Sequence, residues 1–516
     1  MPRPNIRALD LGDSASHNAL THSCPASKRF GRTAGYALVI FLLMLAILNA
    51  FAAAPLPYCN VAMDTGRIPP LPPATTLVQV QVLIRHGSRT PAGMTGTHCW
   101  AGEELATFDC TATLLEAPDA SRPSGVHYSK HYSRGRNKLP GNCMIGQLVR
   151  DGLEMCRMSG RHLRTAYRAL LPASPVGNED AFHLRSDDVP RTLASGQALF
   201  AAMYENVTSG PGSGPAPVTW HTMDSGSDSE TLLPSHLVCP AHAAAFARAV
   251  SAWKQSAHFA NVTTPLAKQM SSALNRTVEP MTIGEFVDCI GSVSCPTVPR
   301  VAGGLPPKAF TPDLQRRVMQ EGGDGLYGIL NDTDVARFGA GPLIGEILIS
   351  MEAAAASTSS VASAPVVAER AAGGAKRGGA SPSFPKFALW SGHDTGPMAP
   401  VLAALKIGGA EFPRFNDLIS IELHRESKAE REAVEGEVVE GEEPPSNLSV
   451  RVVHNGMVVT HLVDGCPPNA QLCDFRTFHA TAASLVPTPS ECGRKDAPAW
   501  WPAPTKQQQR PSFATL

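Results

Sequence analysis

The chain has almost no net charge and lacks the patterns that mark metal or nucleic-acid binding. Its 516 residues include 44 lysines and arginines and 45 aspartates and glutamates, so the formal net charge is −1. This balance provides no overall basic field to attract nucleic acid or an acidic membrane surface. The twelve cysteines contain no paired C-x₂-C spacing, and no carboxylate-rich ligand pattern accompanies them. We therefore expect no metal, no cofactor and no nucleic-acid partner.

Long apolar runs are also missing, with the exception of residues 36–54, which are just long enough to span a bilayer. Lys28, Arg29 and Arg32 precede this segment and favour an uncleaved signal anchor with the N-terminus in the cytosol. A cleaved signal peptide, ending at the small residues around Ala52, is the alternative. Either interpretation places the rest of the chain in the lumen of the endomembrane system, as in a lysosome-like compartment, or outside the cell. The membrane is then a partner only if the segment stays uncleaved.

The cysteines agree with this topology. Eleven of the twelve follow the apolar segment, and an odd number leaves at least one thiol free or paired between chains. The spacings predict local disulfides between Cys289 and Cys295 and between Cys466 and Cys473. Glycosylation sequons fall on the same side of the segment and begin at Asn206, Asn261, Asn275, Asn331 and Asn447.

Composition divides the chain into one large folded region and several looser parts. We expect the folded domain over residues 77–492, preceded and interrupted by segments that cannot bury enough apolar surface to order themselves. These segments are a disordered cytosolic tail (1–35), a Pro-rich stalk (55–76), a flexible insert (353–383), an acidic loop between the last strands (426–446) and a loose C-terminal tail (493–516).

The run from Val82 to Pro91 carries the strongest chemical signal. Its apolar part predicts a buried parallel strand, and ligands in open α/β sheets bind just beyond the carboxyl ends of such strands. Arg85 and Arg89 supply permanently charged donors suited to phosphate oxygens. His86 stands between them as a candidate nucleophile, and Gly87 permits close approach of the backbone to a ligand. The pattern predicts phosphoryl transfer through a phosphohistidine.

Two further segments could complete such a site. The apolar run from Phe387 to Ser391 predicts a second buried strand, and His393 and Asp394 follow it. His393 could hold a phosphate oxygen, and Asp394 could protonate a leaving alkoxide as a general acid. Arg185, at the end of a third run, could add a phosphate donor. Arg191 is expected to form salt bridges within the helix that follows.

These three segments, in this order, resemble the histidine acid phosphatases, the branch of the histidine phosphatase superfamily that includes lysosomal and prostatic acid phosphatases and phytases. Gly146 to Gly152 looks like the family's Gly-x-Leu-Thr-x-x-Gly helix start, and Cys466 and Cys473 resemble its closing disulfide turn. The resemblance implies an α/β fold with a doubly wound, mostly parallel sheet flanked by helices. Its core would cover about 77–204 and 338–480, with a smaller, mainly α-helical cap at about 205–337.

The resemblance also implies roles for the candidate residues. The chain would be an acid phosphatase that hydrolyses phosphate monoesters, with His86 as the nucleophile and Asp394 as the proton donor. Positive charge and positioning do most of the work in phosphoryl transfer, so arginines can replace a metal. Family members often dimerise, which makes a homodimer a possibility. The phosphoryl oxygens would be bound by Arg85, Arg89, Arg185 and His393.

One departure from the family pattern concerns Asp187. The family usually has Arg-Ser-Thr-Asp where this chain has Arg-Ser-Asp-Asp, and an extra carboxylate near the site would repel a phosphate dianion. We expect Asp187 to face outward or to pair with a nearby arginine. Two alternatives stay open: a phosphatase narrowed to phytate, a lysophospholipid or a phosphorylated glycan, and a catalytically weak relative that serves in binding or adhesion.

Overall fold

The computed structural model describes residues 59, 68–92, 99–100, 108, 110, 139, 143–205, 218–224, 226–295, 304–358, 384–408, 411–426, 447–498 and 501. The expected cytosolic tail, the apolar segment 36–54 and most of the low-complexity insert lie outside these residues.

A seven-stranded sheet forms the centre of the described chain. The strand order is β2-β3-β1-β4-β5-β6, and β7 also pairs with β5. Strands β1, β2, β3 and β5 run in one direction, and β4, β6 and β7 run in the other. The strands are β1 (Thr75–Arg85), β2 (Phe182–Ser186), β3 (Phe387–Gly392), β4 (Leu418–Glu426), β5 (Leu448–His454), β6 (Met457–Val458) and β7 (Cys473–Asp474).

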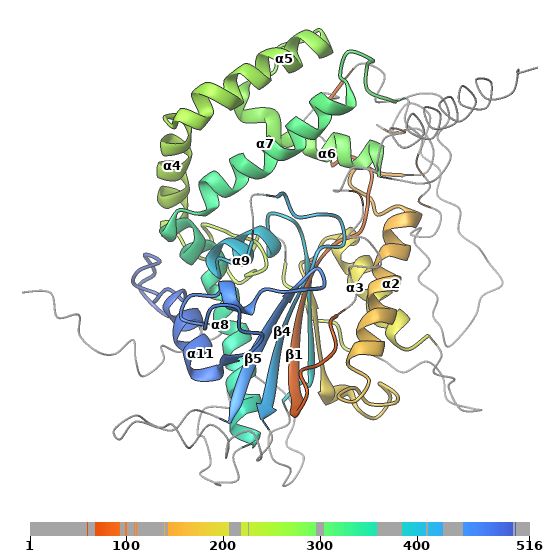
Figure 1. Cartoon of the computed structure of the whole chain (residues 1–516), viewed down its shortest axis with the longest axis vertical. Coiled ribbons are helices and arrows are strands. Elements are labelled where there is room, and N and C mark those ends of the chain that lie inside the picture. Colours follow the sequence, from red (N-terminus) through yellow and green to blue (C-terminus); the bar gives the residue numbers. More distant parts are fainter. Residues whose placement is uncertain are drawn as a thin grey trace, which may run out of the picture. The chain divides into compact units, whose positions relative to one another are not determined.

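Helices cover both faces of this sheet, which confirms the predicted α/β fold (Figure 1). On one face, α2 (Arg150–Ala166) and α3 (Pro190–Met203) pack against alternate residues of β1 such as Val82 and Ile84. On the other face, Leu83 belongs to an apolar core that it shares with residues of α8 (Thr333–Thr358), α9 (Met398–Ala404) and α11 (Phe475–Ser484). The two-residue period of a strand thus gives β1 two apolar faces.

A second group of helices lies beyond one end of the sheet (Figure 1). Its interior is apolar and includes Phe286, Ile290 and Val318. These helices fall within the residues expected to form a helical cap. They are α4 (Ala241–Lys254), the π-helix η5 (Phe259–Thr263), α5 (Thr264–Leu274), α6 (Ile283–Ser294) and α7 (Pro312–Leu330). The described residues also form short 3₁₀ turns at η4 (Glu179–Ala181), η6 (Pro280–Thr282) and η9 (Thr460–Leu462).

Within the described residues, α8 is the one helix long and apolar enough to cross a membrane. Most of it is buried, however, and Leu343, Ile347 and Met351 belong to the core beside the sheet. We therefore interpret α8 as a core helix. It also continues to Thr358, so the first residues of the insert expected at 353–383 are helical.

Disulfides join segments that are far apart in the sequence. The predicted bond between Cys466 and Cys473 is confirmed, whereas the predicted bond between Cys289 and Cys295 is wrong. Two residues that are six positions apart in a helix have Cα atoms about 9 Å apart, which is beyond the roughly 7 Å that a disulfide can bridge. The free thiol expected from the odd count is the buried Cys156. The other pairs in the described chain are Cys59–Cys295, Cys99–Cys289, Cys110–Cys143 and Cys239–Cys492.

Two segments expected to be loose are in part packed on the core. The described end of the Pro-rich stalk buries Ile68, and the carbonyl groups of Pro69 and Pro70 accept hydrogen bonds from the buried Arg451. In the C-terminal tail, Trp501 is buried beside the disulfide of Cys492. Apolar side chains inside proline-rich sequence therefore anchor both ends of the domain.

Candidate active site

The two strand-end motifs meet because their strands are neighbours. Strands β1 and β3 pair in parallel with Arg85 opposite Gly392, so the residues that follow them emerge at the same edge of the sheet. The backbone N–H of His86 donates to the carbonyl of Gly392 at 2.9 Å. The ring centroids of His86 and His393 lie 5.4 Å apart in an edge-to-face arrangement. The expected site at the carboxyl ends of these strands is therefore assembled by the sheet itself.

The His86 side chain is held in the form that a nucleophile needs. Its Nδ1 donates to the carbonyl oxygen of Gly87 at 2.8 Å, which leaves the lone pair on Nε2. That Nε2 is buried and has no hydrogen-bond partner among the described residues. Burial lowers the pKa of His86 well below its usual value, and Arg85, Arg89, Arg191 and His393 lower it further. Both effects favour the neutral imidazole, which is the form that carries a free lone pair on Nε2.

Two glycines allow the His86 loop to pack directly on α2. A Cβ atom on Gly87 would lie 2.1 Å from the carbonyl oxygen of Gly152, and a Cβ on Gly152 would lie 2.0 Å from that of Ser88. The backbone N–H of Thr90 donates to the carbonyl of Gln147 at 2.9 Å. The Gly146–Gly152 segment noted in the sequence therefore supports the loop that carries the nucleophile, because only glycine permits this approach.

Two arginines beside His86 are each paired with a carboxylate. Arg85 Nη2 lies 2.6 Å from Asp394 Oδ2, and Arg89 Nη1 lies 2.6 Å from Asp288 Oδ1. Asp288 comes from α6, and no signal in the sequence indicated it. Both guanidinium groups are almost fully buried, so these carboxylates balance charge that a phosphate dianion could balance instead.

Asp394 is ionised in this arrangement. Burial raises the pKa of its carboxyl group, but Arg85, Arg89 and His393 outweigh that effect and hold the pKa below its ordinary value. Its Oδ1 also accepts from the backbone N–H of Thr395 at 2.7 Å. A carboxylate placed here can act as a general acid only after a proton arrives, or after a bound anion offsets the arginine charge.

The structure corrects the expectation for Arg185. Because Leu184 packs toward α2 and α3, the next residue of β2 points to the opposite face of the sheet. There Arg185 pairs with Glu346 on α8 and with Glu230 at 3.0 Å. Its two terminal nitrogens are engaged by glutamates, and this arrangement does not support a role in phosphate binding.

Arg191 lies at the site instead of Arg185. This is contrary to the expectation that Arg191 forms salt bridges within its own helix. It sits in the first turn of α3, and its Nη2 is 3.3 Å from His393 Nδ1. Burial, and then repulsion from Arg89, lower the pKa of Arg191 to about 10, which leaves it charged at acid and neutral pH. The sequence feature that could have identified Arg191 is its position at the start of a helix that follows a strand end, because side chains there reach the edge of the sheet.

Asp187 also departs from the expectation, because it faces inward and pairs with a histidine. Its side chain is fully buried, and its Oδ2 accepts from His393 Nε2 at 2.7 Å. The contact is possible because β2 and β3 are parallel neighbours, so the residue after Ser186 reaches the residue after Gly392. The extra carboxylate is thus engaged by a histidine of the candidate site.

A model of the histidine phosphatase superfamily (branch 2) matches residues 76–417, a span that includes His86 and Asp394. The chain belongs to this superfamily. The proposed resemblance to its phosphatases is therefore confirmed, and a phosphate ester is the kind of substrate that membership implies. The five disulfides of the described residues agree with a luminal or extracellular location, because such bonds persist in oxidising compartments.

The chain is similar to three known proteins. It is 25% identical over 461 residues to Counting factor 60 of Dictyostelium discoideum, covering 87% of this chain and 95% of that protein. It is 28% identical over 172 residues to Lysophosphatidic acid phosphatase type 6 of Homo sapiens, covering 32% of this chain and 37% of that protein. The apo form of Hafnia alvei phytase aligns with a TM-score of 0.49 and 14% identity, over 82% of this chain and 99% of that one.

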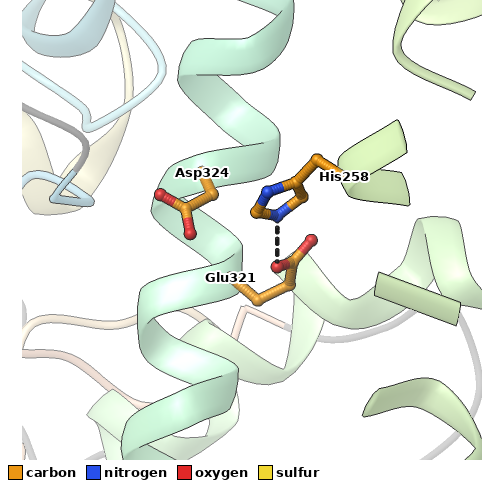
Figure 2. Close-up of side chains that lie close together, drawn as sticks. All are labelled: His258, Glu321 and Asp324. Carbon is orange, nitrogen blue, oxygen red and sulfur yellow. Dashed lines mark hydrogen bonds and ion pairs between the residues drawn. The ribbon is translucent and has the colours of Figure 1, made fainter. Parts of the chain in front are cut away.

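In the described part of this phosphatase, one cluster of side chains consists of residue types that can bind a metal ion. It lies among the cap helices. Figure 2 shows His258 turned toward Glu321 on α7, with Asp324 beside them; their ligand atoms lie within 4.8 Å of one another. Both oxygens of Glu321 are already occupied, one by His258 Nε2 at 2.9 Å and the other by the hydroxyl of Thr263. We interpret the group as a polar link between η5 and α7.

Proposed function

We propose that this chain hydrolyses phosphate monoesters through a phosphohistidine on His86. The neutral, buried and unpartnered Nε2 of His86 among three arginines carries this proposal. An incoming phosphate would displace Asp394 from Arg85 and Asp288 from Arg89, because its oxygens supply the same negative charge. We assign Arg85, Arg89, Arg191 and His393 to the phosphoryl oxygens.

In the first step, the Nε2 lone pair attacks phosphorus while the bond to the leaving oxygen breaks. Asp394, freed from Arg85 by the phosphate, delivers a proton to that oxygen. In the second step, water attacks phosphorus while the bond from phosphorus to Nε2 breaks and returns its electron pair to the ring. The same carboxylate accepts the proton of the water, and inorganic phosphate leaves. Splitting the reaction at His86 replaces one difficult displacement by two easier ones.

The proton for Asp394 arrives with the substrate. The carboxyl group is ionised in the free enzyme, whereas a phosphate monoester keeps its second proton up to about pH 6. The lowered pKa of His86 keeps the nucleophile active at the same acid pH. We therefore expect the reaction to be faster in acid, because the substrate is then a monoanion that carries the needed proton while His86 is neutral.

Hydrolysis of p-nitrophenyl phosphate by the full-length chain tests the proposal. We expect activity in the presence of a chelator, with kcat/KM highest below about pH 6 and falling as the substrate loses its second proton. Initial rates across pH 4–8 provide the measurement. A well-folded chain that hydrolyses no monoester would instead favour a non-catalytic role. Counting factor 60 motivates that second candidate, because its name denotes a factor and not an enzyme, and its alignment covers most of this chain.

The corrected arginine assignment predicts a contrast between two variants. Arg191→Ala should lower kcat/KM by about 10²-fold or more, because a charged donor is lost from a water-poor site. Arg185→Lys keeps a charge near Glu230 and Glu346, and should leave kcat/KM within a few-fold of the original. Steady-state kinetics on both variants decide between the assignments. A larger loss of kcat/KM in Arg185→Lys than in Arg191→Ala would reverse our assignment.

A further inference from the structure

The buried carboxylate of Asp187 has a single ionic partner among the described residues, His393. Burying a charged group costs free energy unless the group is paired and hydrogen-bonded, so an aspartate at this position depends on its pairing with His393. The turn that carries it is fixed: the carbonyl of Asp187 accepts from the backbone N–H of Val189 at 2.9 Å and from the Thr192 hydroxyl at 3.2 Å. The carboxylate is therefore presented to His393 from a rigid position.

His393 is held from both sides of its ring. Asp187 accepts from Nε2, so the proton of the neutral ring resides on that nitrogen. Arg191 can only donate, and its Nη2 lies 3.3 Å from Nδ1, so Nδ1 presents its lone pair. These two contacts select one tautomer and one ring orientation, with Nδ1 on the side of the arginine cluster.

The surrounding charges make this arrangement sensitive to the loss of Asp187. The ring of His86 lies 5.4 Å from that of His393 between centroids, and Asp394 is next to His393 in the chain. Glu230 lies near enough to Asp187 to interact with it electrostatically. Without the carboxylate, the imidazole could change its tautomer or its ring orientation, and Nδ1 would no longer be directed to the phosphate.

We propose that Asp187 is a positioning residue that acts through His393, fixing Nδ1 toward the bound phosphoryl group. The proposal rests on the proposed function, because it assigns His393 to the phosphate. Once Arg191 has turned to a phosphate oxygen, Nδ1 can accept a hydrogen bond from a monoanionic phosphate, or donate one after gaining its proton. The carboxylate balances the charge that the ring then carries.

A double-mutant cycle on the full-length chain tests this role. Asp187→Asn, His393→Ala and the double variant are compared with the original chain by calorimetric titration of inorganic phosphate and by kcat and KM for p-nitrophenyl phosphate. We expect Asp187→Asn to weaken phosphate binding and raise KM by about 10–100-fold, with a smaller change in kcat. In the His393→Ala background the same substitution should change neither quantity more than about two-fold, because the residues act as a unit.

The neighbouring Asp188 provides a matched control, since it is exposed at the same turn. Asp188→Asn should leave phosphate binding unchanged. Asp187→Thr, the residue that the family usually has here, serves if Asp187→Asn does not fold. Equal losses in both backgrounds, or no loss at all, would overturn the proposal. Phosphate binding also separates the two hypotheses: a chain that binds phosphate through Asp187 and His393 without hydrolysing esters would sustain this proposal and reject the proposed function.

Discussion

Replacing His86 with alanine is expected to abolish phosphatase activity, with kcat falling by about 10⁴-fold or more. Nε2 is the atom that would bond to phosphorus, and no other described histidine at the site has an unpartnered ring nitrogen, since His393 uses both of its own. The arginine cluster stays in place in the variant and can still bind phosphate, so KM should change far less than kcat. Steady-state kinetics together with the thermal unfolding midpoint measure both effects.

The intermediate itself offers a second measurement on the same variant. A phosphohistidine survives alkaline quenching and is lost in acid, so brief reaction with ³²P-labelled substrate should label the original chain and not His86→Ala. His461→Ala, a partly exposed histidine on η9, should retain both label and activity. Label that persists in His86→Ala would identify another nucleophile and reject the mechanism.

Asp394→Asn should lower kcat/KM, which reports only the step in which the leaving group departs, by about 10²- to 10⁴-fold, and the size of the loss should depend on the leaving group. An amide cannot give up a proton, so alkyl phosphates, which leave as strongly basic alkoxides, should show the largest loss. With p-nitrophenyl phosphate the leaving phenolate is stable without a proton, and its formation should be far less affected. Rates with a series of leaving groups of increasing basicity measure this dependence in the original chain and the variant.

The matched control for this prediction is Asp288→Asn. Asp288 also balances an arginine of the site, Arg89, at the same 2.6 Å separation that joins Asp394 to Arg85. Loss of charge balance alone would affect both variants alike and would not depend on the leaving group. An equal loss of kcat/KM across all leaving groups in Asp394→Asn would therefore assign Asp394 to phosphate-site electrostatics instead of proton transfer to the leaving group.

Local sequence was sufficient to place His86 and His393 near one another, because each follows an apolar strand and parallel neighbours end at one edge of a sheet. It was insufficient for Arg185 and Arg191, which lie six residues apart around a single turn. Which of them faces the site depends on the face to which β2 directs Leu184 and on the direction in which α3 leaves the sheet. Those are properties of packing, and a motif does not contain them.

The same limit applies to charges that come from distant segments. The pairing of Asp187 with His393 depends on β2 lying beside β3, and that of Asp288 with Arg89 depends on where α6 lies. The error over Cys289 and Cys295 has a simpler cause. Proximity in sequence is a poor guide inside a helix, where the rise per residue keeps such pairs apart.

The position of α6 has a consequence for how this protein can be produced. Asp288 holds Arg89, while the next residue, Cys289, is bonded to Cys99, and Cys295 at the end of the helix is bonded to Cys59. These bonds span 190 and 236 residues of chain. In a cytosol that keeps thiols reduced, the helix would lose both covalent ties next to a phosphate-binding arginine. Recombinant chain made there would be expected to contain a misaligned arginine even where the sheet has folded, so a secretory host is the appropriate source.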